Sequence, residues 1–144
     1  MALTLKDLSG FMKHIDICML ATHGARGIIE TRPVSNNRDI TYKGESYFFT
    51  DKKKAIVREI TKNPVVNLAY SGHHSFLNRK SVYISVNGRA ELITDKAIMR
   101  KHWTKDLDVW FKDGIDTSGV TLIRVKAKTI RYWDGWDEGE LKIK

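Results

Sequence analysis

Two short runs, with a helix-like stretch behind the second, carry most of the information in this sequence. The first is Thr31-Arg32-Pro33-Val34-Ser35, and the second is Tyr47-Phe48-Phe49-Thr50-Asp51-Lys52-Lys53-Lys54. In the first run, Arg32 lies near the end of a β-like segment. In the second run, Thr50 ends an aromatic segment that is expected to be a strand. The lysines then open an apolar-periodic stretch, and Asn63-Pro64 is expected to end that helix.

Each of these features suits a phosphate dianion. A guanidinium is a rigid fork of donors that matches phosphate oxygens. A helix start adds unpaired N–H groups and the positive end of the macrodipole. Arg32 and Thr50, with the charge of Lys53 and Lys54, therefore predict a pocket for a phosphorylated cofactor. The alternative is that Arg32 is a surface charge and that the lysines form a solvated helix start.

Length and composition are those of one globular domain, expected to span residues 1–144. The chain is 42% hydrophobic and 29% charged, which is ordinary for a soluble protein. No apolar run approaches the roughly 20 residues that span a bilayer, and the N-terminus does not resemble a signal peptide. The sequence thus predicts a cytoplasmic protein without a membrane partner.

The net charge of +8 is compatible with nucleic acid or a phosphorylated ligand as partner. The positive residues are spread along the whole chain, and no helix-turn-helix, zinc finger or RNA-binding motif is visible. Aromatic residues are not interleaved with arginines as stacking platforms require. We therefore expect no specific nucleic-acid partner, although nonspecific binding at low salt stays open.

Cysteine and histidine usage gives no metal centre and no nucleophile. Cys18 is the single cysteine and lies in an apolar run, so we expect a buried, inert thiol. His73 and His74 lack carboxylate or cysteine partners at metal-ligand spacing, and they are expected in an exposed loop. No nucleophile–base pair stands out, so catalytic residues are not identified.

Periodicity and turn signals predict about six strands and two or three helices. Pro33 is expected at a strand edge or bulge and Gly88 at a bulge or bend, while residues 71–80 are expected as a loop and 134–140 as a surface arm. The order is not βαβα, which favours an antiparallel barrel or sandwich with helices over its openings. The predicted strands are 17–22, 28–35, 46–50, 65–70, 81–93 and 120–133; the predicted helices are 3–14, 53–62 and 94–103.

The order of these motifs resembles the FMN-binding split β-barrel family related to pyridoxamine 5'-phosphate oxidase, and most closely its general stress protein subgroup. The resemblance covers nearly the whole chain. It implies a mainly β (α+β) fold, an antiparallel six-stranded split β-barrel with flanking helices. The matching segments are Met19-Leu20-Ala21-Thr22, Arg32-Pro33-Val34-Ser35-Asn36-Asn37, Tyr47-Phe48-Phe49-Thr50, Glu59-Ile60-Thr61-Lys62-Asn63-Pro64, residues 83–91, Trp110-Phe111, residues 114–117 and residues 132–135.

The resemblance also implies a homodimer with two flavin sites at the subunit interface. FMN is the expected cofactor, with FAD or another flavin as alternatives. Arg32 and Thr50 would bind the FMN phosphate. The backbone around Pro33, Val34, Ser35 and Phe49 would lie along the flavin ring and ribityl chain.

The helix start departs from the family pattern. Counted back from Asn63-Pro64, the usual serine and lysine of the phosphate site fall on Lys54 and Ile56. Ile56 has no group that binds phosphate, so Lys54 or Lys53 is expected to supply the charge. Trp110 stands near a turn, where its ring could line the flavin pocket.

The predicted function is that of a flavin-dependent oxidoreductase with an unknown redox substrate, because a bound isoalloxazine itself carries redox chemistry. The alternative is a flavin-binding stress protein without turnover: a sensor, store or scavenger. A barrel of this kind that binds haem or a deazaflavin is a further alternative. Oxidation of pyridoxamine 5'-phosphate itself is not expected, because residues 134–140 are acidic and aromatic rather than basic with a histidine.

Overall fold

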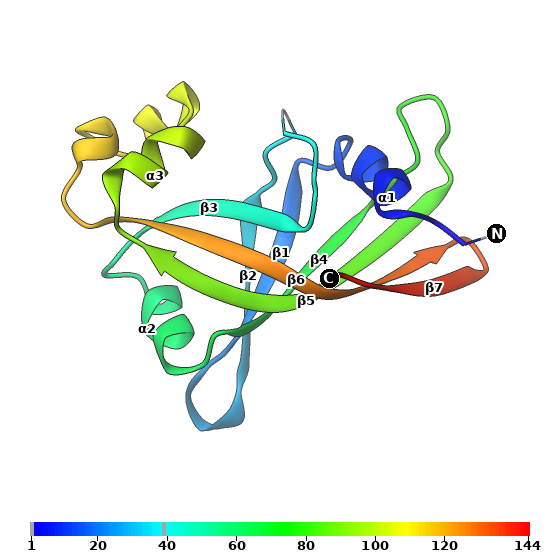
Figure 1. The fold of residues 1–144 in the computed structure, drawn as a ribbon, viewed down its shortest axis with the longest axis horizontal. Helices are drawn as coiled ribbons and strands as arrows, with labels where there is room; N and C mark the ends of the chain where they lie inside the picture. Colours follow the sequence, from blue (N-terminus) through cyan, green and yellow to red (C-terminus); the bar gives the residue numbers. More distant parts are fainter. Residues whose placement is uncertain (1, 39) are drawn as a thin grey trace.

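A single curled antiparallel sheet forms the centre of the computed structural model, which describes residues 2–38 and 40–144 (Figure 1). Its strands lie in the order β2-β1-β4-β5-β6-β3, and β7 pairs with β6 beside this path. The long strand β6 pairs with β3 through its first half and with β7 through its second. The strands are β1 Ile17–His23, β2 Ile29–Ser35, β3 Glu45–Asp51, β4 Val65–His73, β5 Ser81–Ile93, β6 Val120–Asp134 and β7 Asp137–Lys142.

Alternation of side chains decides which face of each strand is buried. Along β4 and β5 the inward residues, such as Leu68 and Val86, are fully buried, whereas their neighbours face outward. The β5–β6 register shifts between Asn87 and Gly88, which confirms the irregularity expected at Gly88. A Cβ on Gly88 would lie 2.2 Å from the Lys126 carbonyl oxygen, so only glycine lets the two backbones approach this closely.

Two amphipathic helices cover the inner face of the sheet from opposite ends (Figure 1). Helix α1, Leu5–Met12, begins at a capping box made by Thr4 and Asp7 and buries Leu8 and Met12. Helix α2, Ala55–Lys62, buries Ile56 and Ile60 in the same core. It begins two residues later than predicted, because Lys54 has extended backbone angles and serves as the N-cap.

A second, smaller core forms where β3 and β6 extend past the main one. It is covered by helix α3, Lys96–His102, and by two 3-10 helices, η2 Lys105–Val109 and η3 Gly114–Asp116. Asp95 caps α3 by accepting hydrogen bonds from the N–H groups of Ala97 and Ile98. These segments, yellow to orange in Figure 1, lie beyond β3.

Two local expectations are wrong. The acidic tail is not a free arm, because residues 137–142 form β7; Gly139 faces Tyr132 there, where a Cβ would collide with the tyrosine ring. The segment 71–80 is not all loop, since β4 continues to His73. The His74 ring is largely buried against Phe11, with ring centroids 4.4 Å apart, and its Nε2 lies 2.5 Å from Asp134 Oδ1.

The architecture is the predicted split barrel, extended by one strand. Strand β2 is an edge strand, as expected from Pro33, and the sheet curls so that Phe48 of β3 shares the main core with Leu20 of β1. Among residues 2–38 and 40–144, no helix is both long and apolar enough to cross a lipid bilayer.

The Cys18 thiol is expected to resist thiol reagents near neutral pH and to react once the chain is denatured. Its side chain is 1% exposed, and burial raises the pKa of the thiol to about 11. The folded state therefore holds this proton between pH 9.0 and about 11, where the unfolded chain loses it. Stability is present below this window and falls as the pH rises through it. Thiol labelling and denaturant unfolding at alkaline pH test this; rapid labelling of the native protein would contradict it.

Candidate functional site

The split of the barrel lies between the two outer strands of the sheet. Among the described residues, β2 pairs only with β1 and β3 only with β6, so each strand keeps one edge without a β partner. The chain that follows β2 and the beginning of β3 line a common cavity, which brings the two edges together at that end. Free N–H and C=O groups along such edges can bind the polar rim of a flat ligand.

Strand β2 turns Arg32 and Val34 toward the interior and Pro33 and Ser35 outward. Val34 packs against the main core and is therefore held in place. Only the backbone of Pro33 and Ser35 remains near the split, and Pro33 has no N–H to donate. This arrangement is compatible with the expected backbone contacts to a ring, and side-chain contacts from Pro33 or Ser35 are not favoured.

Arg32 is held by a hydrogen-bonded cluster inside the barrel mouth. Its Nη2 donates to Glu59 Oε1 of α2 at 2.6 Å, and its Nη1 donates to Thr22 Oγ1 of β1 at 2.8 Å. Thr22 Oγ1 in turn donates to Glu59 Oε1 at 2.8 Å. The Arg32 side chain is 25% exposed and that of Glu59 16%. We call these three residues the Arg32 cluster; it shows that Arg32 is not a free surface charge.

Glu59 and Thr22 were not predicted from the sequence as members of this cluster. A signal for Glu59 existed, because helical spacing sets it beside Ile56 and Ile60, at the border of the buried face of α2. Thr22 is an inward residue of β1 and is 2% exposed, so its hydroxyl needs a partner. The hydrogen-bond partners of these two residues could not be predicted locally, because they form only when β1, β2 and α2 pack together.

The turn between β3 and α2 is held by hydrogen bonds that its backbone N–H groups donate. Lys52 N donates to Gly119 O at 2.8 Å, Lys53 N to Asp51 Oδ1 at 2.9 Å and Lys54 N to Asp51 O at 2.9 Å. A helix start leaves its first N–H groups without intrahelical acceptors, and here these belong to Ala55 and Ile56. The side chains of Lys52–Lys54 are exposed, and their three positive charges exceed the single negative charge of Asp51. No role for Asp51 was predicted from the sequence.

Helix α2 joins this turn to the Arg32 cluster. Thr50 and Asp51 end β3 three residues before the helix begins, and Glu59 stands about 7.5 Å further along than Lys54, at about 1.5 Å per residue. Arg32 therefore contacts α2 at Glu59, beyond the helix start, and a shared site of Arg32 with Thr50 and the helix start stays a prediction. Ile56 is 8% exposed and packs in the core, so it offers only its backbone N–H.

Two predicted site residues are placed differently. The Phe49 ring packs edge-on against Trp103 of the second core, with centroids 4.9 Å apart, so only its backbone is available to a ligand. Trp110 is 80% exposed at the end of η2, in the group of helices beyond β3. Figure 1 shows this group well away from β2, so the structure does not bring Trp110 and Arg32 together within one protomer.

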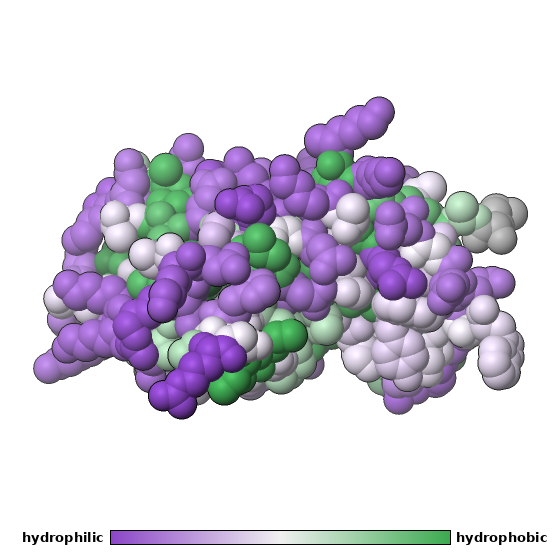
Figure 2. Space-filling view, turned by 90° about the horizontal axis from the view of Figure 1, so that it is seen from below, coloured by the Kyte–Doolittle hydropathy of each residue, from purple (hydrophilic) through white to green (hydrophobic). Residues whose placement is uncertain are grey.

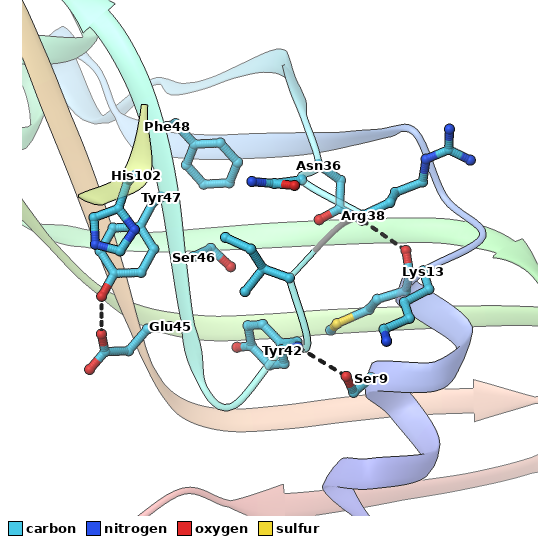
Figure 3. A pocket seen from close by; sticks show the side chains of 13 residues that line it. Ser9, Lys13, Asn36, Arg38, Tyr42, Glu45, Ser46, Tyr47, Phe48 and His102 are labelled. Carbon is cyan, nitrogen blue, oxygen red and sulfur yellow. Dashed lines mark hydrogen bonds between the residues drawn. The ribbon is translucent and has the colours of Figure 1, made fainter. Parts of the chain in front are cut away.

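A cavity that is open to solvent lies at the end of the split next to α1 (Figure 3). One wall is the Tyr47 ring stacked on His102, with centroids 3.7 Å apart and planes 15° apart. The hydroxyl of Tyr47 donates to Glu45. Burial lowers the pKa of His102, which favours a neutral imidazole and an uncharged aromatic wall.

The opposite side of this cavity carries cations and a buried phenol. Lys13 and Arg38 stand on its rim, and Arg38 is paired with Asp16 at 2.8 Å. The Tyr42 hydroxyl is buried and has no hydrogen-bond partner among the described residues; burial also raises its pKa. An aromatic wall, a neutral phenol and a cationic rim suit a planar, polar molecule better than an aliphatic one.

The surface near α2 and the β1–β2 connection carries both hydrophobic and hydrophilic residues. Figure 2 shows hydrophobic residues interrupting a mainly hydrophilic surface on this face. Ile28 and Ile29, at the start of β2, are 53% and 69% exposed.

Comparison with known proteins places this geometry in a family. A sequence model of the family described as "Pyridoxamine 5'-phosphate oxidase like" matches residues 4–143. Protein bli-3 of Neurospora crassa is 28% identical over 138 residues, which cover 89% of this chain and 63% of bli-3. The chain therefore spans less than two thirds of the length of that relative.

Solved structures share the fold at low sequence identity. General Stress Protein 26 from Bacillus anthracis superposes with a TM-score of 0.75 at 19% identity, covering 96% of this chain and 98% of that one. The general stress FMN/FAD binding protein from Xanthomonas citri gives 0.73 at 22%, covering 97% and 95%. A heme binding protein from Mycobacterium smegmatis gives 0.72 at 14%, covering 99% of this chain and 59% of that chain.

Proposed function

Because the chain belongs to the pyridoxamine 5'-phosphate oxidase like family, we propose that it binds FMN in the split between β2 and β3 and acts as a flavin-dependent oxidoreductase. The observation that carries this proposal is the placement of Arg32 against Glu59 of α2, the helix whose start follows the lysine run Lys52–Lys54. An arginine fork, unpaired helical N–H groups and exposed lysines form a donor set that suits a phosphate dianion.

The chain's residues fit the two halves of FMN differently. At the phosphate end, Arg32 and the N–H groups of Ala55 and Ile56 would bind oxygens, while Lys53 and Lys54 supply charge. Along the split, the free edge of β2 offers backbone groups to a ring. FMN would supply the redox chemistry when bound, and the protein would hold it, orient it and limit solvent access. Only FMN carries a terminal phosphate, so the donors at the phosphate end favour FMN over riboflavin.

We further propose that the active form is a homodimer, joined through the outer face of β1, β4 and β5. This face is uncharged over a broad area, whereas the outward residues of β6 are mostly cationic. Its polar groups are already paired, because Asn67 Nδ2 donates to Ser85 Oγ and to Asn87 Oδ1. A surface without charges and with satisfied polar groups can be buried at low cost. Its uncharged outward residues include Ile17, Met19, Ala21, Val65, Asn67, Ala69, Tyr83, Ser85 and Asn87, and the exposed Arg89, which pairs with Val65, stands at its border.

The first test is the visible absorption spectrum of the purified protein, before and after FMN is added and the excess removed. A retained flavin band with a shifted, structured profile supports the proposal. A Soret band would instead assign the barrel to haem, and no retained pigment would contradict a flavin site. Steady oxidation of NADH or NADPH above the free-flavin rate then separates an oxidoreductase from a flavin store or sensor.

A further inference from the structure

The Arg32 cluster is a closed ring of hydrogen bonds. Glu59 Oε1 accepts from both Arg32 Nη2 and Thr22 Oγ1, and Thr22 Oγ1 also accepts from Arg32 Nη1. The second Nη1 proton points to the Leu20 carbonyl oxygen, 3.3 Å away. Three elements, β1, β2 and α2, therefore fix one guanidinium plane.

This ring leaves part of the guanidinium available. Arginine has five N–H donors, and the ring together with Leu20 accounts for three of them. Since the acceptors of Thr22 and Glu59 touch each other, they share the edge formed by Nη1 and Nη2. The neighbouring edge, made of Nε–H and the second Nη2–H, keeps the paired geometry that binds two phosphate oxygens.

Glu59 could act on a phosphate in two opposing ways. Its negative charge lowers the attraction of the site for an anion, and its hydrogen bonds hold Arg32 in one orientation before the ligand arrives. A side chain that is ordered beforehand loses less entropy on binding. Because two Arg32 donors have no partner among residues 2–38 and 40–144, the phosphate does not have to displace the carboxylate, and the ordering effect can be expressed.

We propose that Glu59 is a positioning residue for phosphate recognition: with Thr22 it orients Arg32 so that its free edge faces the FMN phosphate. This inference rests on the proposed function, in which Arg32 binds that phosphate. It assigns a role to two residues that do not themselves touch the ligand.

The test compares Glu59→Ala with Glu59→Gln, because both variants lose the charge and only glutamine keeps an acceptor oxygen. Dissociation constants for FMN and riboflavin are measured by flavin fluorescence quenching. We expect FMN to bind about five- to tenfold more weakly to the alanine variant than to the glutamine variant. Riboflavin, which lacks the phosphate, should bind equally to both. In the ligand-free protein, the NMR signal of Arg32 Nε–H should broaden in the alanine variant only.

A second pair repeats the comparison at the other acceptor: Thr22→Val removes the hydroxyl, whereas Thr22→Ser keeps it. This pair decides the matter if Glu59→Ala does not fold. Equal FMN affinities within both pairs, or tighter binding by Glu59→Ala, would overturn the positioning role. Failure of the wild-type protein to bind any flavin is a different result, since it would refute the proposed function itself.

Discussion

Replacing Arg32 by alanine is expected to weaken FMN binding by about ten- to hundredfold while riboflavin binding changes little. A charge-assisted hydrogen bond contributes about 1.5–3 kcal/mol, and each 1.4 kcal/mol corresponds to about tenfold in affinity. The substitution also leaves Glu59, only 16% exposed, without its cation. Its carboxylate would then repel the incoming phosphate. Fluorescence titration of both ligands measures the difference, because only FMN carries the phosphate.

Arg58→Ala is the matched control for this experiment. Arg58 precedes Glu59 on the same helix, is exposed, and donates one long hydrogen bond, 3.3 Å, to the Lys53 carbonyl oxygen. The Arg58→Ala substitution removes one positive charge, as Arg32→Ala does, but leaves the Arg32 cluster intact. FMN binding should therefore change by less than about threefold. An equal loss of FMN and riboflavin in the Arg32 variant would mean that Arg32 maintains the barrel mouth rather than binding phosphate.

Much of the fold follows from local patterns. Strand β5 has the predicted bounds, because the alternation of apolar and polar residues from Val82 to Asn87 and the glycine at 88 are local signals. Helix α1, Leu5–Met12, lies within the predicted helix 3–14, because its apolar spacing is a local signal. Strand β7 was missed because its sequence, Asp137-Glu138-Gly139-Glu140, lacks strand formers, and pairing with the far half of β6 stabilises it.

The candidate site was predictable only in part. Arg32, Thr50 and the helix start stand out because each residue type suits phosphate by itself. The hydrogen bonds that hold Arg32 join β1, β2 and α2, so they depend on the assembled barrel. Asp51 was missed for a similar reason, because its role is to accept hydrogen bonds within the turn. In the proposed homodimer, the position of Trp110 relative to a flavin would depend on the partner protomer, which no local pattern specifies.

The Ala69→Arg substitution is expected to separate the proposed homodimer into monomers and thereby to abolish tight flavin binding. Ala69 lies at the centre of the uncharged outer face, paired with Met19 of β1 and Ser85 of β5. Its side chain points to solvent in the protomer, so Ala69→Arg should leave the barrel folded. A guanidinium buried in the interface without a partner should weaken association by about a hundredfold or more. Sedimentation velocity and FMN titration on one preparation measure both effects.

The two losses should appear together because a cofactor bound between subunits is linked to their association. Ala97→Arg is the matched control: it introduces the same side chain at an exposed position on α3, outside the outer face of β1, β4 and β5, and should keep both the dimer and the flavin. A dimeric Ala69→Arg protein would show that the subunits meet elsewhere. A monomeric variant that still binds FMN tightly would show that one protomer holds the whole site, and the partner would then have no part in binding the phosphate or the ring.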